Sequence, residues 1–466
     1  NDVFVDTSFT GDTIDGGDHT INIGGTQGSS NAYTGKGDTI DYRNVTSKIT
    51  LVLEDGGATT NVKVGNTAAD HTIANIENIY GSSTVGDEIT GNNLVNTILG
   101  YGGNDTIDGG AGADTITINH AVSSINGGDT TGTSDTLVVA ASSGIIDLRT
   151  ATISDIQVVT VNSGSTLRIT DTQASNITTI NGAGTIEVVI SGNSSVNLSN
   201  MGATTKVVTV SADSTFTGTF ASGTTISVDD GAKLTANYAK LTGFAVNKSN
   251  STGAVEIDIP SASSAASLST ISGTATKTAL FTETQTFTGS LNSVVATISN
   301  GVTVTAAADK VTNQTINKLS SGTGMLDVTV ANVAGQNNAN LTTITGDALH
   351  LVTVTATQIF TGTLHGTIAT TVASGQTLTV ADTIMGTKSI VGAGNATITM
   401  STGTNTANLT SLNVSGTETV QFASGATNFT GGTLSDTDVI SVVSGGTVTL
   451  NGSQLASQTL SGARNV

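Results

Sequence analysis

The 466-residue sequence contains no cysteine and no tryptophan, and its only proline is Pro260. Without cysteine there are no disulfide bonds, so a chain that folds outside the cell needs another cross-link, and a metal ion is the first candidate. No apolar run approaches the roughly 20 residues of a membrane-spanning helix. The sequence starts without methionine, and Asn1-Asp2-Val3 is no signal peptide, so we expect a mature or excised chain.

Charge is also scarce, and it is unbalanced. Only 11% of the residues are charged, but 35 acidic residues stand against 15 lysines and arginines, a formal net charge of -20. This balance argues against nucleic acid as a partner. Threonine makes up about a fifth of the chain, well above ordinary usage. With 56 glycines and an apolar content of 36%, the composition predicts a folded, all-β protein of short strands and tight turns.

The acidic residues are concentrated in one region. Eighteen of the 35 precede residue 141, which separates an acidic, glycine-rich region at 1–140 from the remainder. Within it, "GYGGNDTID" (100–108) and "GGAGADTIT" (109–117) share a nine-residue frame with Gly at positions 1 and 4, Asp at 6 and Ile at 8. "SSTVGDEIT" (82–90) and "GNNLVNTIL" (91–99) continue the frame backwards. Four units in register predict stacked half-coils.

The spacing also predicts where the side chains lie. Six loop residues and three strand residues make half a coil, so position 8 points inward and stacks Ile89, Ile98, Ile107 and Ile116. Position 6 then faces its counterpart two units on, which sets Asp87 against Asp105 and Asn96 against Asp114. Two carboxylates so close repel each other unless a cation lies between them. Calcium takes six to eight oxygens, including the backbone carbonyls that a glycine loop turns inward.

The pattern resembles the G-G-x-G-x-D-x-U-x repeat of the RTX calcium-binding β-roll. "IENIYGSSTVGDEITGN" (76–92) resembles the lead-in to such repeats, and "GKGDTIDYRNV" (35–45) and "TGDTIDGGD" (10–18) resemble degenerate RTX segments. The resemblance implies calcium as the cofactor. The candidate ligands of the regular frame are Asp87, Asn96, Asp105, Asp108, Asp114, Gly100, Gly102, Gly109 and Ala111. The two irregular segments add Asp12, Asp15, Asp18, Asp38 and Asp41. "GGDTTGTSDTLVV" (127–139), which restores Gly-Gly and Asp-Thr-Leu with extra residues between them, adds Asp129 and Asp135. The alternative is that these are solvated acidic turns without an ion.

The remainder alternates short strands with Gly, Asn and Ser bends, as in "IQVVTV" (156–161), "TIEVVI" (185–190) and "LVTVTA" (351–356). Period two dominates, and strand groups recur every 20 to 30 residues or so, which is typical of a solenoid. We therefore expect parallel β-solenoid segments at 141–260 and 261–466, rather than a β-sandwich array. The poorly patterned stretch at 261–278 is interpreted as a break between them or as a linker.

The sequence shows no catalytic motif. The five histidines are scattered, and no nucleophile elbow stands out. Polysaccharide lyases and epimerases are built on parallel β-helices, but their clustered charges and aromatic platforms are missing beyond residue 140. Threonine-rich strands also occur in ice-binding solenoids, although threonine here is spread over many faces. We expect a protein that is not an enzyme.

Acidic, cysteine-free, Thr/Ser/Gly-rich chains with an RTX segment resemble two families. The first is the calcium-dependent surface-layer (S-layer) proteins of Gram-negative bacteria, and the second is the large RTX adhesins. The first resemblance implies a secreted structural protein on the bacterial cell surface, with copies of itself and calcium as partners, and with lipopolysaccharide bound through a region outside this chain. Both families use type I secretion, but the C-terminal "LSGARNV" does not resemble its signal, so the chain is truncated or the route differs.

Overall fold

The computed structural model describes residues 37–55, 58–65, 71–128, 133–140, 144–320, 322–435 and 438–462, and the backbone of 3–5 and 13–15. It is all-β, with 45% of its residues in strands and 7% in helices, and the strands form a parallel β-solenoid of about 19 turns. The predicted fold class, an all-β roll and parallel β-helix, is therefore confirmed.

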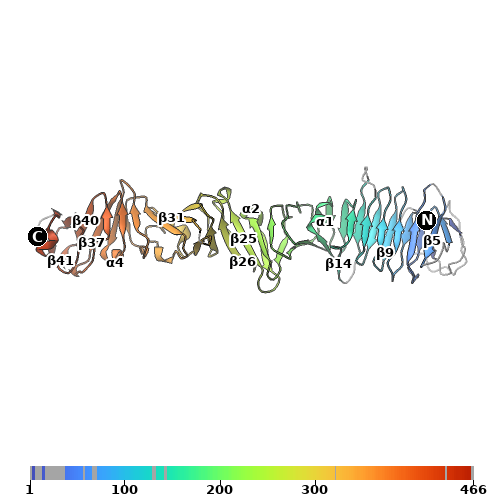
Figure 1. Ribbon diagram of the computed structural model, residues 1–466, viewed down its shortest axis with the longest axis horizontal. Coiled ribbons are helices and arrows are strands. Elements are labelled where there is room, and N and C mark those ends of the chain that lie inside the picture. The colour runs from blue at the N-terminus through green and yellow to red at the C-terminus, as the bar shows by residue number, and fades with distance from the viewer. Residues whose placement is uncertain are drawn as a thin grey trace. The chain divides into compact units, whose positions relative to one another are not determined.

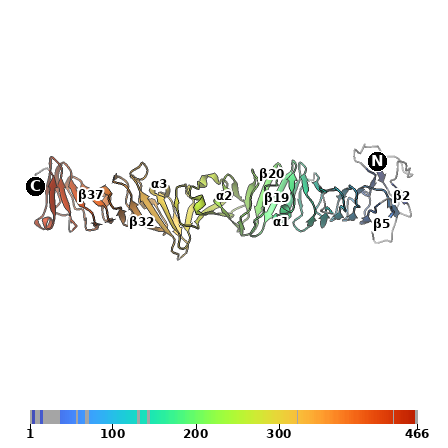
Figure 2. The ribbon, with the colours of Figure 1, turned by 90° about the horizontal axis from the view of Figure 1, so that it is seen from above.

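The chain folds as two units. The first comprises residues 1–234, 244–253 and 273–275, and the second comprises 235–243, 254–272 and 276–466. Within each unit the strands of successive coils lie side by side, as Figures 1 and 2 show.

Three sheets build most of the first unit. One contains, in spatial order, β1 (Val3–Val5), β3 (Thr39–Asp41), β7 (Asn78–Tyr80), β9 (Thr97–Tyr101), β11 (Thr115–Ile118), β13 (Thr136–Val139), β16 (Val158–Val161) and β18 (Thr179–Asn181). The second contains β15 (Thr152–Ser154), β12 (Ser124–Asn126), β10 (Thr106–Asp108), β8 (Glu88–Thr90), β4 (Ile49–Val52), β5 (Thr60–Val64), β6 (His71–Ala74) and β2 (Thr13–Asp15). The third contains β14 (Ile145–Asp147), β17 (Thr166–Thr170), β19 (Thr185–Ile190), β20 (Thr205–Val210), β22 (Thr225–Val228) and β24 (Ala245–Lys248).

The unit also contains α1 (Asp171–Ser175) and β21 (Ser214–Phe216), and β23 (Lys233–Asn237) includes residues of both units. One insertion interrupts the parallel order. Strand β5 pairs antiparallel with both β4 and β6, and nothing in the nine-residue frame indicated it.

Columns of aliphatic side chains form the core of the first unit. Parallel pairing places Ile79, Ile98, Ile116 and Leu137 above one another, all 0% exposed. A second column joins Ile89, Ile107 and Ile125 through pairs that lie 18 residues apart in the chain. The predicted inward direction of position 8 is confirmed. The position-8 side chains of alternate half-coils form two separate columns.

Three further sheets build the second unit. Its first sheet contains β25 (Ala254–Ile259), β26 (Thr276–Phe281), β28 (Val295–Ile298) and β30 (Ile316–Lys318). The next contains β27 (Gln285–Phe287), β29 (Thr303–Ala307), β31 (Met325–Val330), β32 (Leu349–Val354), β34 (Thr370–Val372), β36 (Ile390–Gly392) and β39 (Leu412–Val414). The last contains β33 (Gln358–Phe360), β35 (Thr377–Ala381), β37 (Asn395–Met400), β40 (Glu418–Phe422), β42 (Val439–Val442) and β44 (Thr459–Gly462).

A small sheet of β38 (Gly403–Thr404), β41 (Gly425–Asn428) and β43 (Gly446–Thr449) completes the unit. Its short helices are α2 (Tyr238–Leu241), α3 (Ala308–Val311), α4 (Asp382–Met385) and the 3-10 turns η1 (Ser261–Ser263), η2 (Leu268–Thr270), η3 (Leu341–Thr343) and η4 (Gly452–Leu455). The poorly patterned stretch after Pro260 thus contains η1 and η2, and β25 and β26 on either side of it pair in parallel over six residues.

The structure reveals an internal repeat that the sequence analysis missed. Phe216, Phe287, Phe360 and Phe429 each begin a Phe-Thr-Gly triplet, recur about 70 residues apart and are buried. Just after each triplet, a Thr or Ser forms an isolated parallel bridge with the residue before a buried leucine, in the pairs Asn197–Thr219, Ser267–Ser290, Asn340–Thr363 and Asn408–Thr433. At roughly 22 residues a coil, one repeat spans about three coils.

Candidate metal centre

The acidic side chains of the nine-residue frame lie directly before the core strands. Asp87, Asp105 and Asp114 precede β8, β10 and β11, and all three are 1% exposed. Asn96 precedes β9, Asp135 precedes β13, and both are 0% exposed. Because strands of alternate half-coils stack, these residues form two columns, Asp87–Asp105 and Asn96–Asp114–Asp135.

Within each column a carboxylate reaches back by one coil. Oδ1 of Asp105 accepts a hydrogen bond from the backbone N–H of Asp87 at 2.9 Å. In the other column, Oδ1 of Asp114 accepts from Asn96 at 2.7 Å, and Oδ1 of Asp135 accepts from Asp114 at 2.9 Å. The predicted facing pairs, Asp87 with Asp105 and Asn96 with Asp114, are therefore neighbours in the structure.

Glycines let neighbouring atoms pack closely against these carboxylates. A Cβ added to Gly81 would lie 2.5 Å from Oδ2 of Asp87 and 2.9 Å from the carbonyl oxygen of Gly100 in the next coil. A Cβ on Gly109 would lie 2.5 Å from both Oδ2 of Asp114 and the carbonyl oxygen of Gly127. Only glycine lets a carboxylate oxygen and a carbonyl oxygen converge there. We call these two places the glycine cradles.

Burial changes the protonation of one column. The pKa of Asp105 is raised to about 7, and burial is the largest cause. The hydrogen bond from the backbone N–H of Asp87 lowers this pKa, whereas the negative charge of Asp87 raises it. Burial also raises the pKa of Asp87 to about 6, against hydrogen bonds from Ile49 and Ser82 and the charge of Lys48, which lower it. Ionising both carboxylates is unfavourable because their negative charges repel each other. A bound cation would offset that repulsion.

The other candidates of the regular frame lie in the loops. Oδ1 of Asp108 accepts from the N–H of Gly110 at 3.1 Å, which closes the turn. The N–H groups of Gly102 and Ala111 donate to the carbonyl oxygens of Ser82 and Asn92, one coil earlier, at 3.1 and 2.8 Å. Gly100 lies against Oδ2 of Asp105, as Gly109 does against Asp114. The loops therefore stack through their own backbone hydrogen bonds.

The irregular candidates differ from these. Asp41 is buried, and its carboxylate forms an ion pair of 2.6 Å with Arg43, whose guanidinium lies 5.4 and 5.6 Å from the ring centroids of Tyr80 and Tyr101. Its charge is thus already matched by a cation. Asp38 is half-buried, and its backbone N–H donates to Glu77. Asp12, Asp18 and Asp129, and the side chain of Asp15, lie outside the described residues.

The chemistry of these donors selects the kind of metal. In the described part of the chain, no three His, Cys, Asp or Glu side chains lie close enough together to hold a metal ion. A site here would combine one or two carboxylates with amide and backbone carbonyl oxygens. Such hard oxygen donors fit calcium, whereas zinc prefers nitrogen and sulfur ligands. The glycine cradles and the buried carboxylates therefore fit a calcium ion.

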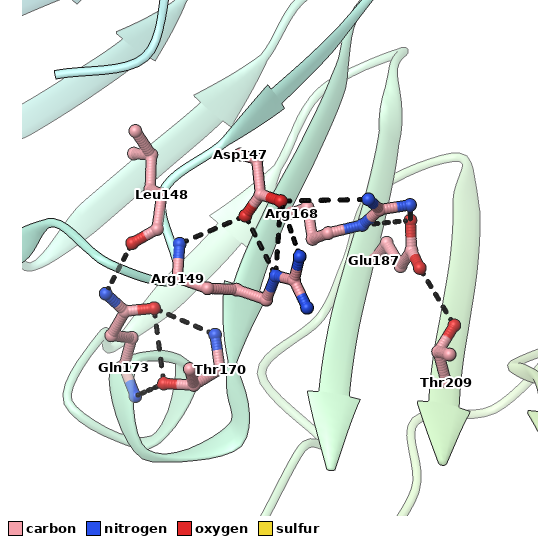
Figure 3. Close-up of polar contacts among 8 residues, drawn as sticks. All are labelled: Asp147, Leu148, Arg149, Arg168, Thr170, Gln173, Glu187 and Thr209. Atoms are coloured by element: carbon pink, nitrogen blue, oxygen red, sulfur yellow. Dashed lines mark hydrogen bonds and ion pairs between the residues drawn. The ribbon is translucent and has the colours of Figure 1, made fainter. Parts of the chain in front are cut away.

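A second charged cluster lies on the third sheet of the first unit (Figure 3). Arg149 contacts Asp147 at 2.7 Å, and Arg168 contacts Glu187 at 2.8 Å and Asp147 at 3.7 Å. Thr209 donates to the other oxygen of Glu187 at 2.9 Å. Two arginines and two acids balance one another, so the cluster ties neighbouring coils together. The sequence analysis missed it because these residues are neighbours only once the strand register is known.

No family model matches the chain, and no curated protein sequence matches it. None of the helices in the described residues is long and apolar enough to span a membrane.

Proposed function

We propose that the protein is a calcium-dependent S-layer protein whose copies form a two-dimensional lattice on the bacterial cell surface. The observation that carries the proposal is the pair of buried acidic columns, stacked coil on coil and packed against the glycine cradles. Buried carboxylates on consecutive coils are costly for a fold unless something neutralises them. Millimolar calcium outside a cell would do so.

Asp87 and Asp105 would hold calcium in one column, and Asn96, Asp114 and Asp135 in the other, with carbonyl oxygens such as those of Gly100 and Gly127. Bound calcium supplies positive charge and links consecutive coils. Extracellular modules bind calcium with affinities of about 10⁻⁴ to 10⁻³ M, so the fold would respond to the difference between the inside and the outside of a cell. This is consistent with export of an unfolded chain by type I secretion.

Calcium also bears on assembly. With a formal net charge of -20, copies of the chain repel one another at short range. Salt screens such charges only beyond about 10 Å at 0.1 M, so close contacts between acidic surfaces need divalent ions or neutralisation within the coils. Ordered coils would also give every copy the same interface, which a closed lattice requires.

The second candidate is a segment of an RTX adhesin that projects from the cell. The repeat of about 70 residues favours it, because adhesins extend by tandem repetition. Both candidates share the calcium requirement, and they differ in whether folded copies assemble.

Electron microscopy separates the two candidates. Purified protein is imaged in millimolar calcium, magnesium or chelator at equal ionic strength. The double variant Asp105→Asn with Asp114→Asn is compared with Asp309→Asn, which removes an acid from a surface pair with Lys310 at 3.5 Å. Ordered sheets in calcium alone, lost in the double variant and kept in the control, would support the lattice. Calcium-dependent folding without sheets would favour the adhesin, and folding indifferent to calcium would refute both.

A further inference from the structure

A second stacked pair of acids lies in the second unit, far along the chain from the acidic region. Strands β40 and β42 belong to consecutive coils and pair Thr419 with Val439. The residues immediately before this pair, Glu418 and Asp438, therefore occupy the same register. Both are buried, with Glu418 6% and Asp438 0% exposed. When two adjacent carboxylates are shielded from solvent, ionising both costs considerable free energy.

One serine joins the two carboxylates. The hydroxyl of Ser435 is hydrogen-bonded to Oε2 of Glu418 and, at 2.8 Å, to Oδ1 of Asp438. The backbone N–H of Ser435 donates to Oδ2 of Asp438 at 2.8 Å, and the N–H of Val414 donates to Oε1 of Glu418 at 2.8 Å. Ser435 has one hydroxyl hydrogen for two carboxylate oxygens, so the arrangement is one hydrogen short when both acids are ionised.

In the described part of the chain, the strands packed against β40 and β42, which are β37, β39, β43 and β44, contain no charged residue. Preceding β44, Gln458 donates from Nε2 to the carbonyl oxygen of Ser435 at 2.9 Å and is neutral. Strand β43, which reads Gly-Thr-Val-Thr, has no titratable side chain. Among the described residues the charge that acts on Asp438 is that of Glu418; Asp436 lies outside them. Burial is the largest cause that raises the pKa of Asp438, and Glu418 raises it further, against the hydrogen bonds from Ser435.

We infer that Glu418 and Asp438 share one proton through Ser435, and that its loss loosens the coils around β42. In the protonated state Oδ1 of Asp438 donates to Oγ of Ser435, whose own hydrogen goes to Oε2 of Glu418, so every hydrogen has an acceptor. On deprotonation the proton passes to water and leaves two buried charges facing each other. In the glycine cradles, backbone carbonyl oxygens lie beside the carboxylates and would bind a cation. Between Glu418 and Asp438 the neighbouring group is the hydroxyl of Ser435, so this pair holds a proton instead of a cation.

The sign of the pH dependence follows from the raised pKa of Asp438. A carboxyl whose pKa is higher in the folded than in the unfolded state stabilises the fold fully at pH values below the unfolded value, and this contribution is lost as the pH rises through the folded one. The coils around β42 therefore open more readily as the solution becomes alkaline. This is the opposite of the usual behaviour of an acid in an ion pair.

Amide hydrogen exchange, measured on the whole chain in the presence of calcium, tests the inference. Protection factors, corrected for the intrinsic pH dependence of exchange, are measured from about pH 4 to about pH 9. Between the ordinary pKa of an aspartate, about 4, and the raised pKa of Asp438, protection in β40 and β42 should fall by up to about tenfold per pH unit, since opening releases one proton. Strand β19 in the first unit is the internal control. In Glu418→Gln one charge is gone, so the pH dependence of protection should become weaker, and only the part that the burial of Asp438 causes should remain.

Three results would overturn the inference: wild-type protection that does not change with pH, the same pH dependence in Glu418→Gln, or protection at high pH that extra calcium restores, which would make the pair a cation site. If Glu418→Gln does not fold, infrared spectroscopy of the wild type decides. A protonated carboxyl band that persists near neutral pH and is missing in Asp438→Asn supports the inference, and a wild type without that band refutes it.

Discussion

Asp41, Asp105 and Asp438 are buried carboxylates at the ends of strands, but their neighbours differ. Asp41 has Arg43 within 2.6 Å. Asp105 has the backbone of Asp87 and a glycine. Asp438 has a serine hydroxyl and a second acid. The neutralising partner of Asp41 is an arginine, and on our proposals it is a calcium ion at Asp105 and a proton at Asp438, so a few neighbouring residues decide it.

Asp105→Asn tests the calcium role of a single residue. The amide keeps an oxygen for the N–H of Asp87, but it carries no charge. At about pH 8, above the raised pKa of Asp105, the variant should be more stable than wild type in chelator, because a buried charge is gone. It should also lose about 1 to 3 kcal/mol of the calcium-dependent stabilisation. Thermal unfolding with and without calcium measures both effects.

Asp41→Asn is the matched control for this experiment. It should lower stability equally in calcium and chelator, because the partner it loses is Arg43. Equal calcium gains in Asp105→Asn and wild type would contradict the role of Asp105.

At the scale of the element, a half-coil is defined by one apolar residue, one acid and one glycine. The sequence predicted that Ile89, Ile98, Ile107 and Ile116 point inward and that Asp87 faces Asp105, since four units in strict register leave little freedom. The structure divides the four isoleucines between two columns. It failed to find the repeat of about 70 residues, because members such as Phe216 and Phe287 share only a few residues across a long period. Glu418 and Asp438 were missed for a related reason, since no glycine-rich frame announces them.

Gly109→Ala tests the glycine cradle. The new Cβ would lie 2.5 Å from both an Asp114 oxygen and the backbone carbonyl of Gly127, and the latter cannot move without displacing the next coil. We expect a loss of about 1 to 3 kcal/mol, the usual cost of overpacking, seen as a lower urea midpoint. Gly192→Ala is the control, because its Cβ would meet no atom within 4 Å. Equal midpoints for the two variants would rule out a close-packed cradle.

At the scale of the whole molecule, the two units differ in their acidic content. The candidate calcium ligands all belong to the first unit, and 18 of the 35 acids precede residue 141. In a solenoid each coil contacts only its neighbours, so a perturbation spreads only as far as coupling between coils carries it. Metal removal should therefore act regionally.

Chelation should lower hydrogen-exchange protection in β8, β10 and β11 of the first unit and leave β35 and β37 of the second unit unchanged. The reason is that the buried acids of the first unit lose their proposed counter-ions, while β35 and β37 bury aliphatic side chains such as Leu378 and Ile398. Magnesium in place of calcium is the control, because its smaller, rigid coordination sphere suits these loops poorly. Protection lost in both units alike, or in neither, would contradict the assignment.

The bridge that follows each Phe-Thr-Gly triplet also bears on how such a chain changes over generations. A block that begins and ends at equivalent bridges, such as Ser267–Ser290 and Asn340–Thr363, has the same kind of parallel backbone pairing at both ends. Duplicating or deleting one block in the gene would therefore leave every remaining joint intact. Length becomes a trait that recombination can adjust in increments of about 70 residues, without the compensating mutations that a globular fold would demand.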